Sequence, residues 1–441
     1  MYAVVDCDNC FVSCERVFQP DLKGRPVVVL SNNDGCVVAR SNEAKALGIK
    51  MGVPIYQIKD LVQKHGVEIR SSNYVLYADM SNRVMSILRT PTEWVEAVEQ
   101  YSIDEAFLTL RGAKESPAFV PSMNLEQWAH ALVKQIGQWT GMPVSIGIAP
   151  TRTLAKAATW FAKHYKGYDK VCIIDTDEKR QKALQLLDIG EVWGVGWRGV
   201  DKYRYFGIQT AWDLTQRSQS WVQQRFTVTG ARTWKELCGI SCITTLEQTE
   251  KKTICTSRSF DGMVEEQGEL EMYVSNYAAH CAEKLRRQHS VCSMVTCFAQ
   301  TNHHRLDLAQ MDGGMTVTMV TPTASTHEVV AAALRALRSF YRKGYKFKRA
   351  GVIVSGITSD AAVQQDLFDT LTPEQRQKMN RLSEIMDVIN RHYGNDTIQL
   401  AVQQFPIDPE TGEHTNFRDL LRHDYRSRCY TTNMDEIIEV K

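Results

Sequence analysis

The sequence predicts an α/β (α+β) multidomain protein. Its 441 residues exceed what one ordinary hydrophobic core organises, and they suggest several domains of about 100–150 residues each. Strand-like and helix-like patterns alternate over residues 1–175, a helical region follows to about residue 240, and the alternation resumes over 253–355. The hydrophobic content of 43% and the charged content of 23% are ordinary for a globular protein and argue against long disordered regions.

The first region combines short apolar runs with amphipathic segments. Residues 32–35 (NNDG) predict a turn that joins two strands into a hairpin. Ser41 is a plausible N-cap of the helix that follows, and Gly48 is a plausible C-cap. The predicted strands are residues 2–6, 26–31, 36–39, 96–100, 106–110 and 144–148. The predicted helices are residues 9–18, 41–47, 75–88, 125–140 and 153–165.

The second region has the element order of a small ferredoxin-like module. A helical stretch that begins at 175–187 separates it from the first region. The pattern is β/α/β/β/α/β. Its predicted elements are 253–260, 270–288, 293–299, 316–320, 327–341 and 350–355. Residues 356–441 are polar, acidic and weakly patterned, so no element is predicted there.

The charge is unevenly distributed along the chain. Lys plus Arg is 52 and Asp plus Glu is 51, so the formal net charge of +1 excludes nucleic-acid binding by undirected bulk charge. Residues 360–441 contain 15 acidic and 9 basic side chains, a net charge of −6. The remaining residues therefore have a net charge of +7. We predict a basic body with an acidic tail that contacts other proteins.

The sequence shows no recognisable targeting signal, and this predicts a cytoplasmic protein. No run approaches the roughly 20 apolar residues of a membrane span, and MYAVVDCDNC lacks the features of a secretion signal. The 12 cysteines are therefore expected to be reduced thiols. Cys7, Cys10 and Cys14 could indicate metal binding, but no Cys or His pair follows at finger spacing, so small buried thiols are the preferred interpretation.

Three carboxylates lie at strand ends in the first region. Asp6 ends the first strand, and Asp104 and Glu105 occupy the turn of YSIDEAFLTL. Acidic side chains between apolar strands need a cation or a hydrogen-bond donor. Oxygen ligands from two neighbouring strands suit two divalent ions, which together clamp an in-line phosphoryl transfer. By spacing alone, two unrelated solvated turns are an equal alternative. Asp8 is a weaker candidate.

Several segments resemble a known family at these same residues. MYAVVDCDNCFVSCE, YSIDEAF, SNEAKALGIKMG and GIAPTRTLAKAATWFAK are similar to Y-family translesion DNA polymerases. SNNDGCVVAR, SSNYVLYADMSNRVMS, the WGVG segment and the closing YTT resemble the UmuC-type subfamily, the catalytic subunit of bacterial DNA polymerase V. The resemblance covers residues 1 to about 370 well and the remainder patchily.

The resemblance implies a right-hand polymerase with a palm, fingers, a helical thumb that contains a helix-hairpin-helix, and a ferredoxin-like little finger. The implied divisions are a palm (1–18 and 73–170), fingers (19–72), a thumb (171–242), a little finger (250–356) and a C-terminal tail (357–441). The implied enzyme is a DNA-directed DNA polymerase, a nucleotidyltransferase that synthesises past damaged DNA with low fidelity in the SOS response. The alternatives are a non-catalytic DNA-binding or checkpoint subunit that keeps the fold, and a nucleotidyl cyclase with a palm-like sheet.

For the active site, the resemblance implies that Asp6, Asp104 and Glu105 are the catalytic metal ligands and that the backbone carbonyl of Cys7 is a further ligand. The ions would be two Mg²⁺. One would activate the primer 3′-hydroxyl, and the other would hold the triphosphate and stabilise the leaving pyrophosphate. No protein nucleophile is needed.

Further residues are implied to bind the nucleotide. Phe11 stands where the family has a steric gate that clashes with a ribose 2′-hydroxyl. Lys45 and Lys163 are implied to contact the triphosphate, and Lys156 shares a helix face with Lys163. Asn42 stands where many relatives have a phosphate-binding Tyr, so that contact is left open. Without the family, a buried aromatic and solvated lysines would be the simpler interpretation.

Two segments are candidates for DNA binding. GVGWRG contains Gly194 and Gly196 and fits a dinucleotide-binding pattern, but its flanks are helical and no strand precedes it. It is more similar to a helix-hairpin-helix whose backbone N–H groups hold a DNA phosphate. Residues 335–349 contain seven Arg or Lys and no acid, with interleaved aromatics. The predicted phosphate contacts in that run are Arg342, Lys343, Lys346 and Lys348.

A short motif follows the second region. Gln364, Leu367 and Phe368 resemble the peptide that docks into a sliding clamp with two apolar side chains in a pocket. The implied partners are therefore primer-template DNA, a deoxynucleoside triphosphate (dNTP), a UmuD′-type dimer, a RecA filament and the sliding clamp, with no membrane. The expected location is the cytoplasm, at the nucleoid when the enzyme is active.

Overall fold

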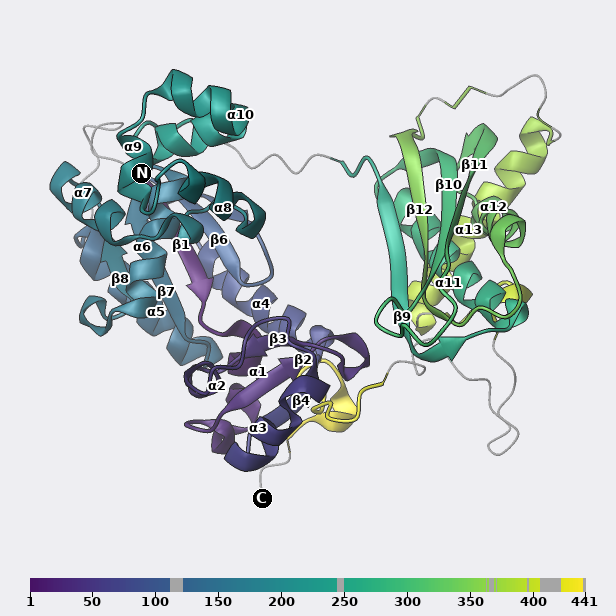
Figure 1. Cartoon of the computed structure of the whole chain (residues 1–441), viewed down its shortest axis with the longest axis horizontal. Helices are drawn as coiled ribbons and strands as arrows, with labels where there is room; N and C mark the ends of the chain where they lie inside the picture. The colour runs from purple at the N-terminus through teal and green to yellow at the C-terminus, as the bar shows by residue number, and fades with distance from the viewer. Residues whose placement is uncertain are drawn as a thin grey trace. The chain divides into compact units, whose positions relative to one another are not determined.

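The computed structural model divides the chain into two compact units, Met1–Glu247 together with Asp424–Lys441, and Gln248–His423 (Figure 1). Each unit is described by itself. The described residues are 1–111, 122–243, 250–361, 363–364, 369, 371–394, 396–404 and 422–438. Among them, no helix is long and apolar enough to cross a membrane.

A five-stranded sheet forms the centre of the first unit, in the order β5-β6-β1-β7-β8. β1 pairs antiparallel with both β6 and β7, and β7 pairs parallel with β8. Because helices cover both faces, the middle of β1 is fully buried. The strands are β1 Tyr2–Cys7, β5 Val95–Gln100, β6 Glu105–Leu110, β7 Val144–Ala149 and β8 Val171–Ile173.

The two faces of this sheet pack against different helices. Ala3 and Val5 join a core with α1, α4 and α5, whereas Val4 and Phe107 join a core with α6. Gly147 on β7 permits the approach of α6, since an added Cβ would lie 2.1 Å from the backbone nitrogen of Thr159. The helices are α1 Cys10–Phe18, α4 Tyr74–Arg89, α5 Leu125–Thr140 and α6 Arg152–His164.

A small three-stranded sheet, in the order β3-β2-β4, forms a separate layer of the first unit. β2 and β3 are the predicted hairpin, and the Ser41 side chain accepts from Ala44 N as the predicted N-cap of α2. The prediction missed α3, β4 and β8, which are short and only partly apolar. These elements are β2 Val27–Leu30, β3 Val37–Arg40, β4 Glu68–Ser71, α2 Asn42–Ala46 and α3 Lys59–His65.

The helical region consists of short helices that pack beside α6. Their buried side chains belong to the same core as Val4 and Phe107. The GVGWRG segment follows the short helical turn Ile189–Glu191 and includes the first turn of α8, so no strand leads directly into it and the dinucleotide-binding alternative is excluded for this segment. The helices are α7 Asp177–Leu186, α8 Trp197–Tyr205, α9 Ala211–Thr215 and α10 Gln219–Leu237.

The second unit has the predicted β/α/β/β/α/β element order. Its four strands are all antiparallel, in the order β11-β10-β12-β9, and α11 and α12 pack on one face. This confirms the ferredoxin-like module. The elements are β9 Ile254–Val264, α11 Gln267–Arg287, β10 Ser290–Thr301, β11 Asp312–Thr323, α12 Thr326–Phe340 and β12 Phe347–Ser359.

The weakly patterned residues 356–441, for which the sequence predicts no element, contain one long helix. α13, Pro373–Tyr393, begins with a capping box between Thr372 and Gln375. Its apolar side chains Leu382, Ile385 and Val388 are exposed, and ion pairs attach the helix to the rest of the unit. Arg286 on α11 pairs with Asp387 at 2.6 Å, and Arg376 pairs with Glu328 on α12 at 3.1 Å.

Candidate active site

Two of the predicted carboxylates face each other across paired strands. Asp6 on β1 is the register partner of Glu105 on β6. Val4 and Phe107, which precede Asp6 and follow Glu105 by two residues, point into the core beneath α6. Because side chains alternate along a strand, Asp6 and Glu105 also point to the α6 side of the sheet. The predicted convergence of these two carboxylates is therefore present in the structure.

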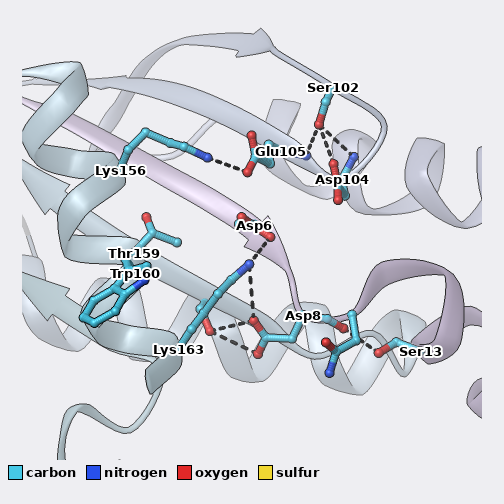
Figure 2. Close-up of polar contacts among 12 residues, drawn as sticks. Asp6, Asp8, Ser13, Ser102, Asp104, Glu105, Lys156, Thr159, Trp160 and Lys163 are labelled. Carbon is cyan, nitrogen blue, oxygen red and sulfur yellow. Dashed lines mark hydrogen bonds and ion pairs between the residues drawn. The ribbon is translucent and has the colours of Figure 1, made fainter. Parts of the chain in front are cut away.

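Two lysines of α6 reach these carboxylates (Figure 2). The Lys163 ammonium contacts Asp6 Oδ1, and Lys156 Nζ lies 2.5 Å from Glu105 Oε1. The two lysines are seven residues apart, so they lie on one face of the helix, as predicted. Each carboxylate at the strand ends thus has its own cation from the helix above it.

Asp8 belongs to a polar contact at the edge of this group. Ser145 Oγ donates to both carboxylate oxygens of Asp8, at 2.9 and 3.0 Å, and Lys170 Nζ lies 2.8 Å from Oδ2. Lys163 lies 3.9 Å from Asp8 Oδ1, which is farther than its contact with Asp6. These partners fix the Asp8 carboxylate beside the Asp6 and Glu105 pair.

Asp104 lies in the turn before β6, beside a serine. Ser102 Oγ donates to Asp104 Oδ1 at 2.5 Å and accepts from the backbone N–H groups of Asp104 and Glu105, at 3.2 and 3.1 Å. Cys7 N donates to Asp104 O at 2.9 Å, which joins the turn to the end of β1. Within the part of the chain that the structure describes, no three His, Cys, Asp or Glu side chains are placed to hold a metal ion together.

The proximity of Asp6 and Glu105 shifts both pKa values. Burial, and then the hydrogen bond to Glu105, raise the pKa of Asp6 to about 7, although Lys163 opposes this. Burial alone would raise the pKa of Glu105, but the hydrogen bond from Asp6 and the charge of Lys156 outweigh it, so its pKa lies below the ordinary value. Two facing carboxylates in a half-buried site thus require a proton or cations.

By chemical type these carboxylates suit a hard divalent cation, although the three side chains do not converge on one position in the structure. Asp6, Asp104 and Glu105 offer only oxygen ligands, which Mg²⁺ prefers, and lysine ammonium groups now pair with Asp6 and Glu105. A hydrogen bond with Cys10, and then burial, raise the pKa of the Cys7 thiol. Cys7 therefore keeps its proton, and only its backbone carbonyl could serve as a ligand. A hydrogen bond with Cys14 raises the pKa of Cys10 as well.

Phe11 lies in the first turn of α1, the helix that follows the strand ending in Asp6 and Cys7. Its ring stacks on Tyr77 of α4, with centroids 4.6 Å apart and an interplanar angle of 15°. Tyr74 meets it edge-on at 5.7 Å. Phe11 is half-buried, so one face of the ring is packed while part of the side chain stays accessible. This arrangement suits an aromatic that contacts a ligand from a fixed position.

Lys45 lies in a small polar cluster with two asparagines. Its Nζ donates to Asn9 Oδ1 at 2.6 Å, and Asn9 Nδ2 donates to Asn42 Oδ1 at 3.1 Å. Burial, and then the charges of Arg40 and Lys163, lower the pKa of Lys45. Lys45 and Lys163, from different layers of the unit, are thus near enough to influence each other. An anion between them would relieve this repulsion.

Comparison with known proteins assigns the chain to a family. Residues 5–160 match the impB/mucB/samB family, and residues 251–367 match its C-terminal domain. The protein ImpB of Salmonella typhimurium is 38% identical over 99% of both chains. The protein UmuC of the same species is 37% identical over the full length of both. The chain belongs to the impB/mucB/samB family. This confirms the resemblance to UmuC-type proteins.

Other relatives of this impB/mucB/samB chain extend the comparison. DNA polymerase IV of Corynebacterium diphtheriae is 32% identical over 58% of this chain and 57% of its own length. A solved Y-family DNA polymerase chimera of Dbh and Dpo4 is 21% identical with a TM-score of 0.62, and it covers 81% of this chain and 100% of its own. The fold is therefore that of Y-family polymerases. Residues 380–440 match a domain of unknown function.

The predicted DNA-contact residues lie on both units. Gly196 is the N-cap of α8, and Gly194 adopts φ +94°, a conformation that favours glycine. In the second unit, Arg342, Lys343 and Lys346 are exposed between α12 and β12. Lys348 instead donates to the backbone carbonyls of residues 260–262, at 2.6, 2.9 and 3.2 Å. It therefore already has a structural role at the end of β9.

The candidate clamp-binding motif is only partly described. Gln364 is exposed, which suits a docking segment, whereas Leu367 and Phe368 lie outside the described residues. The motif stays a prediction.

Sequence reasoning missed several residues that organise the site. Ser102, Lys170 and Glu15 were not singled out. Ser102 and Lys170 contact Asp104 and Asp8, and Glu15, on the helix that carries Phe11, accepts from Tyr77. Glu15 left a signal, since a lone acid stands at i+4 from Phe11 on an otherwise apolar helix face. Ser102 also left one, because it stands inside the YSIDEAF motif two residues before Asp104. Lys170 left none, because its contact with Asp8 joins residues 162 positions apart.

Proposed function

We propose that this chain is an error-prone, template-directed DNA polymerase that synthesises past damaged DNA by nucleotidyl transfer in the SOS response. Its family, its Y-family fold and the names of its relatives support this function. The observation that carries it is the pairing of Asp6 with Glu105 at adjacent strand ends, beneath two lysines of one helix. Oxygen ligands for metal ions and cations for phosphate there share one half-buried site.

The chain's own residues have distinct roles in this proposal. Asp6, Asp104 and Glu105, with the carbonyl of Cys7, would hold two Mg²⁺ ions. When bound, such ions activate the attacking hydroxyl and stabilise the leaving pyrophosphate. Ser102 holds the Asp104 carboxylate in the turn before β6. No side chain forms a covalent bond to the nucleotide.

Cationic side chains would bind and orient the triphosphate. Lys163 and Lys45 approach the site from α6 and α2, and the charge of each affects the other. Lys163 now neutralises Asp6, so it is already directed at the position where phosphate and carboxylate charges must be compensated. Phe11, stacked on Tyr77, would exclude a ribose 2′-hydroxyl by its bulk.

The predicted divisions and partners complete the proposal. The proposed divisions are a palm (1–18 and 73–170), fingers (19–72), a thumb (171–242) and a little finger (250–356). Together they would hold primer-template DNA through sequence-independent phosphate contacts. A UmuD′-type dimer, a RecA filament and a sliding clamp are the proposed protein partners. We place this activity in the cytoplasm, at the nucleoid.

Primer extension tests the proposed function. The wild-type chain, with its proposed partners, should extend primers on undamaged and abasic templates, and Asp104→Ala combined with Glu105→Ala should abolish extension. A matched control replaces Asp177 and Glu178, which are acids of the first turn of α7. That control should extend primers as the wild type does. Persistent synthesis in the Asp104/Glu105 variant would refute the mechanism and favour a non-catalytic DNA-binding subunit.

A further inference from the structure

The C-terminal segment, residues 424–438, belongs to the first unit and lies against its N-terminal part (Figure 1, in yellow). It pairs with the end of β4, where Ser71 N donates to Tyr425 O at 3.1 Å and Tyr425 N donates to Ser71 Oγ at 3.0 Å. It then continues along α4 and α1, the two helices that carry Tyr77 and Phe11. We call residues 424–438 the C-terminal segment below.

One face of α1 connects the gate candidate to this segment. Phe11, Glu15 and Phe18 are spaced i, i+4 and i+7, so they lie on the same face of the helix. Phe11 stacks on Tyr77 at 4.6 Å, and Phe18 stacks on Tyr430 of the C-terminal segment at 4.6 Å with an interplanar angle of 8°. Gln19 Nε2 also donates to the Tyr430 hydroxyl, at 2.9 Å.

Glu15 lies between these two aromatic contacts and is fully buried. Its Oε1 accepts from the Tyr77 hydroxyl at 2.6 Å and from Ser427 Oγ at 3.0 Å. Burying a carboxyl group is costly unless donors satisfy it. The hydroxyl of Ser427 is therefore part of what holds Glu15, and Glu15 in turn fixes the hydroxyl end of Tyr77.

A buried asparagine fixes Ser427 in turn. Asn73, the N-cap of α4, is 1% exposed. Its Nδ2 donates to Ser427 Oγ at 3.1 Å, to Ser427 O at 3.2 Å and to Arg428 O at 3.1 Å. A continuous set of contacts thus runs from Asn73 through Ser427, Glu15 and Tyr77 to Phe11.

The first turn of α1 has no side-chain cap, so other contacts hold it. Its N-cap, Asn9, adopts a left-handed conformation with φ 48° and makes no side-chain capping hydrogen bond. Capping side chains ordinarily fix the first helical turn. Without one, the first turn is held by the Ser13 hydroxyl, which donates to Asp8 O at 2.6 Å, and by the stacking of Phe11 on Tyr77.

We propose that the C-terminal segment positions the steric gate. Through Ser427 and Tyr430 it orients α1 and Tyr77, and these hold Phe11 where it excludes ribonucleotides. The proposal rests on the proposed polymerase function and gives a role to part of the domain of unknown function matched at residues 380–440. Ser427 and Tyr430 are positioning residues, since neither touches Phe11 itself.

Sugar selectivity is the decisive measurement. In the full-length chain, Ser427→Ala and Tyr430→Ala should each raise the ratio of ribonucleotide to deoxyribonucleotide kcat/KM by about 2- to 10-fold, the size expected from losing one hydrogen bond or one packed contact. Phe11→Ala, which removes the gate itself, should give the largest increase in this ratio. Thr431→Val is the matched control, because Thr431 belongs to the same segment but donates to Asp79 at 2.7 Å, away from Glu15. It should leave the ratio unchanged.

Hydrogen exchange provides a readout that needs no catalysis. Backbone amides of the first turns of α1 should exchange faster in Ser427→Ala than in Thr431→Val. If Tyr430→Ala fails to fold, Tyr430→Phe keeps the ring against Phe18 and loses only the hydroxyl that Gln19 contacts. That variant should show a smaller shift in the same direction.

The outcomes separate the two proposals. Wild-type chain that inserts neither nucleotide refutes the proposed function, and hydrogen exchange then decides whether the C-terminal segment still orders α1. Active Ser427→Ala and Tyr430→Ala variants with wild-type sugar selectivity overturn the gate proposal alone, even if their melting temperature falls. If the backbone amides of α1 exchange at the same rate in Ser427→Ala and Thr431→Val, the C-terminal segment does not order α1.

Discussion

The two ends of α6 carry buried charge in different ways. At its N-terminal end the Arg152 side chain is 0% exposed, contacts Glu99, and lies over the rings of Tyr2 and Phe107 at 4.9 and 5.0 Å. Toward its C-terminal end, Lys163 is 28% exposed and contacts Asp6. One helix thus has a fully buried cation, Arg152, at one end and a partly exposed cation, Lys163, at the other.

The difference corresponds to the chemistry of the two side chains. Arginine has a planar, permanently charged group that stacks on aromatic rings and suits a fixed ion pair. Lysine is a compact charge on a flexible stem, so it can leave one anion for another. Arg152 therefore stabilises the fold through a fixed ion pair. Lys163, by contrast, can leave the Asp6 carboxylate and bind a phosphate. The predictions below test this division.

The largest expected effect is on catalysis at the lysine end. Asp6→Asn should lower kcat/KM for nucleotide insertion by about 10³-fold or more, because a metal ligand and its charge are lost. Unfolding by urea should change little, since one of two facing carboxylates is neutralised. A loss of activity below tenfold in single-nucleotide insertion assays would contradict the assignment of Asp6.

The Arg152 end should show the opposite pattern. Arg152→Met should lower the free energy of unfolding by about 3 kcal/mol, since it leaves Glu99 without this partner and removes a buried stacked group. Arg83→Met, which breaks an exposed pair with Asp79, is the control and should cost less than about 1 kcal/mol. Equal losses in the two variants by urea unfolding would break the comparison.

Lys163 should affect substrate binding more than stability. Lys163→Met should raise the KM for dNTP by about 10- to 100-fold, the effect expected when a charge-assisted contact to phosphate is lost. Lys170→Met removes a lysine that contacts Asp8 instead, and it should change the KM much less. An unchanged KM in Lys163→Met would mean that this lysine only neutralises Asp6.

The smallest expected effect is on the pH dependence of stability and comes from Glu15, a buried carboxyl group whose hydrogen-bond donors, Tyr77 and Ser427, are both neutral. Burial raises the pKa of Glu15 above its ordinary 4.5, although hydrogen bonds from Tyr77 and Ser427 oppose it. Its stabilising contribution is therefore fully present below pH 4.5 and is lost as pH rises through the folded-state pKa. The stability of the wild type should accordingly fall relative to Glu15→Gln as pH rises, measured by urea unfolding.

An exposed glutamate provides a control of opposite sign. Hydrogen bonding to a helix-start amide lowers the pKa of Glu178, so its contribution is present above its ordinary pKa and lost as pH falls. The wild type should therefore gain slightly relative to Glu178→Gln as pH rises. The same trend in both variants would mean that Glu15 is not buried as the structure places it.

Local patterns in the sequence were sufficient for much of the fold. Apolar runs placed β1, β6 and β7, a turn signal placed the β2–β3 hairpin, and Ser41 was recognised as an N-cap. The family motifs singled out Asp6, Glu105 and Lys163 together. These succeeded because strand alternation and helix periodicity are set by neighbours in the chain. α13 was missed although it begins with a capping box between Thr372 and Gln375, which is a local signal.

Local sequence patterns were enough for most of the elements of both units, for the carboxylates at the ends of β1 and β6, and for the family, but not for α3, β4, β8 and α13. Only the tertiary structure decided which cation meets which carboxylate, and that Ser427 donates to Glu15. These contacts join residues up to 412 positions apart. No local pattern encodes such a pairing, because the energy of burying a charge depends on the side chains that folding brings around it.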